Sequence, residues 1–407
     1  MTNPYFLMII LYIGLAILTA LDAALISFDI LLFLRGLRWL RIHFITLGIL
    51  TELIFALMPN LVAIRTKQPK PKLRWDIWAT LNAGILTLLV GIPMIDTNVI
   101  LIGGTLVFTA TTLLSVQLYQ MRGKGTASAN SADEIDPHIG RKFYIGGLSY
   151  FLLGIIIGTG LWLGWGEYMY MKVPLEVHIH ANNWGLMSLV FAGLIIDLYS
   201  KFTGRSLQWP RSITPIFWLM TLGAFGLVMG PWLGSLWFTV PGLVAHLTAT
   251  VWLIANMVRP LKGDRKAWTP GIWHLITSYT WILVPVLGGV LITIKTPGIS
   301  GAGVEANAPQ ALIYGWVLQF GFALVPYFFR QNFTPNQPAK LGGSWFSLAT
   351  VHLGGIALWV SIFLSEPLSG LVHGSAYVFW TLSILPILKE VWGIINQSME
   401  NLEEKTP

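Results

Sequence analysis

The sequence contains no cysteine and few charged residues. Of its 407 residues, 11% are Asp, Glu, Lys or Arg, whereas soluble domains contain about 25%. The missing thiols exclude disulfides, iron–sulfur clusters, thiolate metal sites and cysteine nucleophiles. The sequence also lacks a Walker phosphate loop, a Rossmann glycine fingerprint and an HExxH zinc motif. These absences argue against the common soluble nucleotide-binding and metalloprotease classes.

Apolar residues dominate the chain instead. They make up 55% of the sequence, and the mean hydropathy is +0.67. Apolar stretches of about 20 residues recur, and each can cross a bilayer core of about 30 Å as a helix. The first stretch is too long for a cleavable signal peptide and lacks a basic flank, so we expect it to remain as an anchor. Composition thus predicts an all-α, multi-pass protein of the cell membrane, surrounded by lipid.

Twelve membrane-spanning helices are expected in this chain. Their predicted ranges are about 5–33, 42–64, 76–97, 99–121, 143–165, 177–200, 212–233, 236–258, 270–294, 309–329, 345–364 and 371–395.

The distribution of basic residues predicts the orientation of these helices. Lys and Arg are concentrated after the second, fourth, sixth and eighth spans, and the connections 95–98, 234–235 and 366–367 contain none. Because basic connections stay in the cytoplasm, they and both termini are predicted to be cytoplasmic. The net charge of +7 therefore indicates membrane orientation and gives no reason to expect nucleic-acid binding.

Three polar segments stand out from the apolar background. We interpret residues 123–140 as a cytoplasmic linker and residues 398–407 as a frayed polar tail. Arg35, Arg38 and Arg41 lie on the expected outer side, where basic residues are unusual. They either extend to the membrane interface or pair with a buried anionic group.

A histidine followed five residues later by glycine occurs twice. His43 precedes Gly48, and His180 precedes Gly185, with an offset of 137 residues between the copies. A further step of 136 residues reaches Trp316 and Gly321. This period predicts three repeats, 1–122, 141–260 and 268–396, each with four helices and with the motif at the head of its second helix. An even number of spans per repeat predicts pseudo-three-fold symmetry, because inverted repeats require an odd number.

The repeated histidines are the main candidates for ligands. Imidazole binds haem iron and copper well, and nearby arginines suit the propionates of haem. His178 lies beside His180 and joins the candidates for metal binding. The alternative is that histidine and glycine only mark close helix packing. Elsewhere we expect hydrogen-bonded structural histidines at 246, 274 and 352, and an inert one at 138.

Two segments resemble known haem proteins. Gly36-Leu37-Arg38-Trp39-Leu40-Arg41-Ile42-His43 resembles the second helix of haem–copper oxidase subunit I, especially in the cbb3-type and nitric-oxide-reductase branches. The segment around His178 and His180, with Gly185 and Gly193 after it, resembles NnrS-like haem- and copper-containing membrane proteins.

The first resemblance implies a fold and a cofactor. Subunit I has twelve helices in three arcs of four, and its second, sixth and tenth helices line pores. It implies haem bound by His43, with Arg38 and Arg41 facing the propionates. The second resemblance adds copper, with His178 and His180 as its candidate ligands. Redox partners or other respiratory subunits are expected to bind such a protein.

The chain also departs from the oxidase pattern. The seventh span contains no histidine, and the tenth offers only Tyr314, Trp316 and Gln319. The copper site and the proximal haem ligand of a complete oxidase are therefore missing. If His43 binds haem, the second axial ligand must lie elsewhere; we expect His373, with His352 as the reserve.

Two carboxyl groups are expected within the membrane. Asp22 lies in the middle of the first span and Glu52 in the middle of the second. Each would cost about 2.5–3.5 kcal/mol if it faced lipid, so we expect both to face inward. They form either a proton route toward His43 or a structural hydrogen-bonded pair. Asp197 is expected to pair with Lys201, four residues further along the helix.

These patterns favour a divergent haem-binding membrane protein. It would transfer electrons or handle a diatomic gas such as oxygen or nitric oxide near the outer face. One alternative is an active terminal oxidase or nitric oxide reductase with relocated ligands, such as His246, His274 or His352. The other is a haem-free, proton-coupled transporter in which the histidines, Asp22 and Glu52 carry protons.

Overall fold

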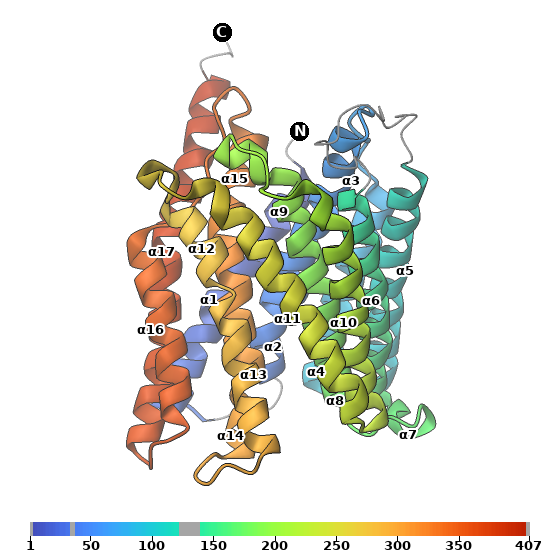
Figure 1. The fold of residues 1–407 in the computed structure, drawn as a ribbon, viewed down its shortest axis with the longest axis vertical. Helices are drawn as coiled ribbons and strands as arrows, with labels where there is room; N and C mark the ends of the chain where they lie inside the picture. Colours follow the sequence, from blue (N-terminus) through green and yellow to red (C-terminus); the bar gives the residue numbers. More distant parts are fainter. Residues whose placement is uncertain (1–2, 33–36, 122–138, 404–407) are drawn as a thin grey trace. The chain divides into compact units, whose positions relative to one another are not determined.

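The computed structural model describes residues 3–32, 37–121 and 139–403. Every regular element in these ranges is a helix, and the ranges contain no strand (Figure 1). The expectation of an all-helical chain is therefore confirmed. Most of the predicted linker, as well as Arg35 and His138, lies outside the described residues.

Eleven helices among the described residues are long and apolar enough to cross a membrane. A twelfth apolar helix, Trp345–Ser361, has 17 residues. Each predicted span therefore has a helical counterpart. The eleven long helices are Pro4–Ser27, Arg38–Arg65, Trp75–Met94, Thr97–Gln120, Ile139–Leu163, Pro174–Thr203, Pro210–Leu233, Leu236–Leu261, Pro270–Ile292, Gly301–Phe333 and Leu368–Asn401.

The chain divides into two units, one made of residues 1–53 with 264–407 and the other of residues 54–263. The first unit begins and ends the chain. Its main elements are α1 (Pro4–Ser27), α2 (Leu37–His43), η1 (Phe44–Leu50), α12 (Pro270–Thr277), α13 (Thr280–Thr293), α14 (Gly301–Gln310), η6 (Ala311–Val317), α15 (Leu318–Phe333), α16 (Trp345–Ser361) and α17 (Leu368–Glu403).

Glycines allow close packing in the first unit. At Gly354 of α16, a side chain would meet the indole of Trp380 on α17. At Gly374 of α17, it would meet the ring of Phe28, which follows α1. Small residues let helices approach closely where apolar burial gives no net attraction, as in lipid.

The second unit contains most of α3 (Thr51–Arg65) and the helices up to residue 263. These are α4 (Trp75–Met94), α5 (Thr97–Gln120), α6 (Ile139–Leu163), α7 (Trp165–Tyr168), α8 (Pro174–His180), η2 (Ala181–Met187), α9 (Ser188–Thr203), η3 (Pro210–Ser212), α10 (Ile213–Leu233), α11 (Leu236–Val258) and η4 (Arg259–Leu261). Here α10 and α11 are in backbone contact, because a Cβ at Gly242 would lie 2.8 Å from the carbonyl oxygen of Gly223.

The second, sixth and tenth long apolar stretches are the most buried. In their most apolar windows, 78%, 83% and 94% of residues are buried, compared with 28–56% in the other eight long helices. A helix that is buried on every side belongs to a core, whereas one with an apolar exposed face suits lipid. The stretches that carry the histidine motif and its expected third copy are therefore the interior ones.

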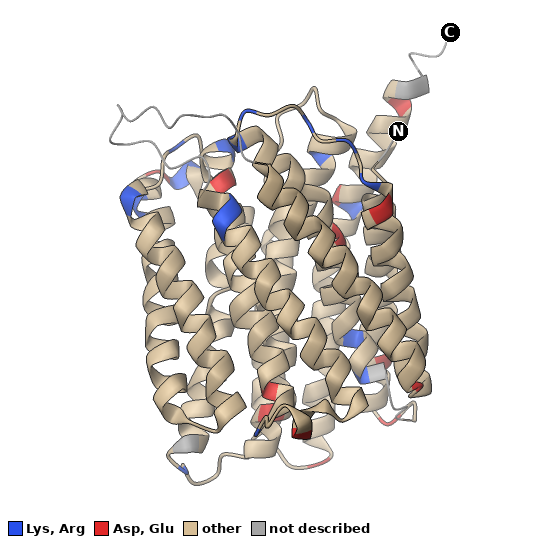
Figure 2. Ribbon diagram, turned by 90° about the vertical axis from the view of Figure 1, so that its right-hand side faces the viewer, with Lys and Arg blue, Asp and Glu red and all other residues tan. Residues whose placement is uncertain are grey.

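Local sequence sets many helix starts. Asn3 caps α1 and Pro4 follows it, while Asp96 caps α5 through two backbone amides. Such side chains satisfy amide groups that the first turn leaves without partners. Lys and Arg lie mostly at helix ends and in connections (Figure 2).

The expectation of a frayed tail from residue 398 is wrong as far as residue 403, because α17 continues to Glu403 through the strong helix formers Met, Glu and Leu.

Candidate functional site

A π-helical segment lies near the start of each interior stretch, after a short α-helical segment. η1, η2 and η6 each have seven residues and follow an α-helical segment directly. The last residue before each segment is His43, His180 or Gln310. π-Helical turns are rare and occur frequently at functional sites.

A glycine occupies the fifth position of all three π segments. Gly48 lies against Tyr12 of α1, Gly185 against Tyr150 of α6, and Gly315 against Trp281 of α13. At each site the nearest atoms to an added Cβ belong to the aromatic side chain of the preceding long helix. The same local arrangement therefore occurs three times in the chain.

The third position differs from the one expected from the sequence. The matching glycine is Gly315, with Gln310 in the place of the histidine, and not Gly321 with Trp316. A Cβ at Gly321 would meet nothing within 4 Å. Trp316 is instead fully buried within η6. The expectation followed a constant spacing, whereas the third segment begins 130 residues after the second.

His43 is held by its own helix. Its Nδ1 lies 2.8 Å from the carbonyl oxygen of Trp39, and its ring stacks on the indole of Trp39 at 4.0 Å. A carbonyl oxygen only accepts hydrogen bonds, so Nδ1 carries the proton in the neutral ring. The lone pair is then on Nε2, which is the arrangement found at metal-ligating histidines.

His178 and His180 contact different helices. Nδ1 of His178 lies 2.8 Å from the carbonyl oxygen of Gly154 on α6, and that of His180 lies 2.6 Å from Leu227 on α10. The ring of His178 also packs on Gly158, where a Cβ would be 2.6 Å from Cε1. Two residues apart on a helix means a rotation of about 200°. This geometry does not fit one copper ion held by both imidazoles.

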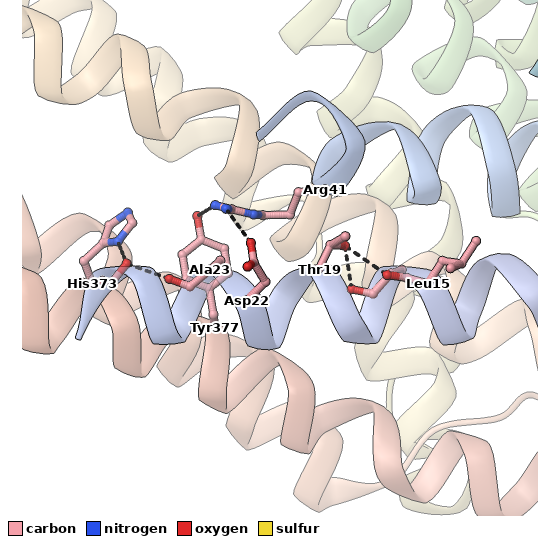
Figure 3. A network of polar contacts seen from close by, with 9 residues as sticks. Leu15, Thr19, Asp22, Ala23, Arg41, His373 and Tyr377 are labelled. Carbon is pink, nitrogen blue, oxygen red and sulfur yellow. Dashed lines mark hydrogen bonds and ion pairs between the residues drawn. The ribbon is translucent and has the colours of Figure 1, made fainter. Parts of the chain in front are cut away.

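Arg41 connects three elements of the first unit (Figure 3). Its guanidinium donates to the hydroxyl of Tyr377 on α17 at 3.3 Å and lies 3.9 Å from the carboxylate of Asp22 on α1. Arg41 is buried, and its Nε has no hydrogen-bond partner. Ring contacts place His373 beside Tyr377 at 5.3 Å. The result is a buried polar cluster with one spare cationic donor.

His373 belongs to this cluster through Ser27. The Ser27 hydroxyl donates to the carbonyl oxygen of Ala23 at 2.8 Å, so Nδ1 of His373, 2.9 Å away, donates to Ser27. His43 follows Arg41 by two residues and therefore projects about 200° around α2 from it. The pairing of His43 with His373 as axial ligands stays a prediction.

Arg38 links the second helix to the tenth. Its guanidinium donates to the carbonyl oxygen of Ala306 on α14 at 3.0 Å. The side chain of Arg38 is exposed, unlike that of Arg41. The two expected propionate partners thus lie in different surroundings.

The two carboxyl groups lie in different surroundings. Asp22 interacts with Arg41 at 3.9 Å, whereas Glu52 is fully buried. The expected proton route and the expected pair between the two carboxyl groups stay predictions.

The other membrane histidines are hydrogen-bonded, as expected. His246 contacts the carbonyl oxygen of Trp184 at 3.3 Å. His352 accepts from the indole of Trp281 at 3.1 Å and donates to Thr277 at 2.9 Å. Both its nitrogens are therefore engaged, which makes His352 a poor reserve ligand. His274 and Thr277 both contact the amide oxygen of Gln319, each at 3.3 Å.

A second charged cluster lies in the second unit. Asp197 receives hydrogen bonds from Arg65 at 2.9 Å and from Tyr144 at 2.8 Å. The expected partner Lys201 is not the direct one, because Arg65 reaches the buried carboxylate from another helix and also donates to Ile196. Sequence spacing within one helix could not reveal this partner.

Among the described residues, no three His, Asp or Glu side chains are grouped so that they could hold one metal ion. No protein-family model matches the chain, and no curated protein is significantly similar to it. Fold and composition define the chain as an all-helical, multi-pass membrane protein.

Proposed function

We propose that this chain is a haem-binding membrane protein, a divergent relative of haem–copper oxidase subunit I. The bond from Nδ1 of His43 to the carbonyl oxygen of Trp39 carries the proposal. It fixes the tautomer in which Nε2 can bind iron.

The arginines fit the charge of such a cofactor. Haem carries two propionates, and the guanidinium group binds carboxylates well. Arg41 is buried with its Nε lacking a partner, so it can still donate to an anionic group. Arg38, which donates to the carbonyl oxygen of Ala306 through one nitrogen, would bind the propionate on the exposed side.

The haem would supply one-electron chemistry and a site for a diatomic gas. The chain's own residues would fix the ring of His43, hold the propionates and keep the site within apolar helices. His373 would support the Arg41 cluster rather than bind the iron. Copper is not part of the proposal, because His178 and His180 diverge.

The proposal includes a topology. The chain would cross the cell membrane twelve times in three groups of four helices, with both termini and the basic connections in the cytoplasm. The threefold occurrence of a π segment with an aromatic-packed glycine supports these groups. A redox partner or another respiratory subunit would dock at the membrane surface.

An absorbance spectrum of the purified protein tests the proposal. The protein would be extracted from membranes in detergent and compared in its oxidised and reduced forms, with haem extraction as a second readout. We expect a Soret band that shifts on reduction. His43→Ala should abolish the band, whereas His373→Ala should retain it.

Folding must be controlled in this comparison. Both variants should elute with the wild type on size exclusion, since neither side chain is fully buried. A well-folded wild type without haem would sink the proposal. A Soret band that survives in His43→Ala would move the ligand to another residue.

A proton-coupled transporter is the second candidate. The observation that favours it is the Asp22–Arg41 contact, because an ion pair of 3.9 Å with 8% and 23% exposed side chains can open when the carboxylate gains a proton. A purified protein that has no haem absorbance, and that changes the pH inside vesicles during transport, would support this candidate over the haem protein.

A further inference from the structure

Residues 198–263 of the second unit carry positive charge and no negative charge, because they contain no Asp or Glu. Their basic residues lie in or beside two connections. Residues 204–212 lead from α9 to α10, and residues 259–263 follow α11. The basic residues are Lys201, Arg205, Arg211, Arg259 and Lys262. The two connections therefore form a basic end on three apolar helices.

Asn256 holds the two connections together. It is fully buried in α11, and its side-chain oxygen accepts from the backbone amide of Trp209 at 2.7 Å. Its side-chain nitrogen donates to the hydroxyl of Ser212 at 2.9 Å. Arg205 adds a further link, because its guanidinium donates to the carbonyl oxygen of Pro260. The basic side chains are thus presented by a scaffold of fixed hydrogen bonds.

Arg259 lies over the indole of Trp209. Its guanidinium carbon is 4.8 Å from the ring centroid, and the side chain is exposed. An aromatic face attracts a cation but carries no net charge, so it does not neutralise Arg259. Lys262, three residues later, is also exposed. Elsewhere in this unit, Arg65 and Arg74 each pair with a carboxylate. The basic end therefore presents two exposed cations beside an aromatic ring.

The helices that lead to this end expose apolar side chains. Trp218 and Leu222 on α10 and Val251 on α11 are 55%, 60% and 62% exposed. Such faces suit acyl chains, and an indole at a helix end suits the level of lipid headgroups. A free phosphate ion would meet only the cations. A phospholipid would meet the cations, the indole and the apolar faces together, so the surroundings favour a lipid over a soluble anion.

We propose that this basic end binds a phospholipid with a negatively charged headgroup. Arg259 and Lys262 pair with the headgroup phosphate, which a guanidinium can bind through two hydrogen bonds. Trp209 lies beside the same headgroup and holds Arg259 over its ring. Each Lys or Arg close to an anionic bilayer strengthens binding about fivefold. The site needs no haem, so it stands or falls separately from the proposed function.

Binding of phosphatidylglycerol to the purified full-length protein tests this site. The protein is kept in an uncharged detergent, and native mass spectrometry measures the apparent Kd for phosphatidylglycerol and for phosphatidylcholine with the same acyl chains. The test variant combines Arg259→Gln with Lys262→Gln. The matched control combines Lys70→Gln with Lys72→Gln, which removes the same charge from another connection where both side chains are exposed.

We expect the wild type to bind phosphatidylglycerol more tightly than phosphatidylcholine. The test variant should bind phosphatidylglycerol about tenfold or more weakly, because two cations are lost, and the control should bind it like the wild type. Without lipid, all variants should share the wild-type Tm, because the changed side chains are exposed. If the double variant does not fold, Lys262→Gln alone decides, with an expected loss of about fivefold.

Three results would overturn the proposed lipid site. One is equal affinity of the wild type for the two lipids. Another is equal weakening in the test variant and the control, which would mean that net charge alone attracts the lipid. The third is displacement of phosphatidylglycerol by inorganic phosphate at the same concentration, which would make this a site for a soluble anion.

Discussion

Gly48 packs so closely on Tyr12 that no side chain fits between them. A Cβ at Gly48 would lie 2.5 Å from Cγ of the tyrosine, well inside van der Waals contact. The same relationship joins Gly185 to Tyr150 and Gly315 to Trp281. The contact holds the π segment beside the long helix that precedes it, and it explains why glycine is required there.

Alanine at Gly48 should therefore destabilise the protein. Overpacking a tight contact costs about 1–3 kcal/mol, which exceeds the gain of up to about 1 kcal/mol that alanine gives in a helix. Thermal unfolding in detergent measures the effect. Gly321→Ala is the control, because a Cβ there meets nothing within 4 Å; it should leave Tm unchanged or raise it. Equal losses in both variants would contradict the packing argument.

Removing the partner of a buried carboxylate should be costly. Arg65→Met leaves Asp197, which is only 4% exposed, without its cation, and breaking such a pair costs about 3–5 kcal/mol. The exposure of the Arg65 side chain, 28%, places the effect at the lower end. The double variant Arg65→Met with Asp197→Leu should recover much of the loss in Tm. If the double variant does not recover Tm, the unpaired charge of Asp197 is not the cause of the loss.

The hydrogen bond between Trp281 and His352 predicts a graded pair of variants. His352→Phe leaves the indole N–H without its acceptor, so we expect a loss of about 1–3 kcal/mol. His352→Gln retains an acceptor near the same place and should lose less. Thermal melts of both variants in detergent make the comparison. Equal stability of the two would show that the bond contributes little.

Removing the charge of Arg41 should lower the midpoint potential of the proposed haem. A nearby cation favours the reduced form, which carries one positive charge less, so its loss favours the oxidised form. Arg41→Gln is the test and Arg41→Lys the charge-conserving control, both measured by a spectroscopic redox titration. An unchanged potential in Arg41→Gln would place the haem away from this cluster.

The absence of cysteine permits a clean test of orientation. Lys70→Cys lies in a basic connection and Asn98→Cys in the first turn of α5, after a connection without basic residues, and both native positions are exposed. In intact cells, a membrane-impermeant maleimide should label the second variant and not the first, because basic connections stay in the cytoplasm. The reverse pattern would invert the topology.

The helices were predictable because their signal is local. Length and apolarity are read from one stretch at a time, and every expected span has a helical counterpart. The match of His43 with His180 also depends on a short motif. The third position was not found, because the constant spacing that indicated Trp316 ignored a connection of different length. Aromatic residues 36, 35 and 34 positions before Gly48, Gly185 and Gly315 were the available signal.

The partners of the polar side chains were not predictable. Arg65 and Asp197 are 132 residues apart in sequence, and Arg41 and Tyr377 are 336 apart. Nothing in one sequence relates such positions, because the contact follows from how helices pack. The expected pairing of Asp197 with Lys201 used helix periodicity, which detects only neighbours on the same helix.

The first unit combines the two ends of the chain, and this has a consequence for biosynthesis. Residues 1–53 share that unit with residues 264–407, and the chain is made from its N-terminus. Residues 54–263 can therefore complete their own contacts, including Arg65 with Asp197, before residues 264–407, which share a unit with the earliest helices, have been made. Arg41 can meet Asp22 early but gains Tyr377 only when the last helix enters the membrane. A chain interrupted before residue 264 should thus leave its first helix exposed to quality-control proteases after its middle has already folded.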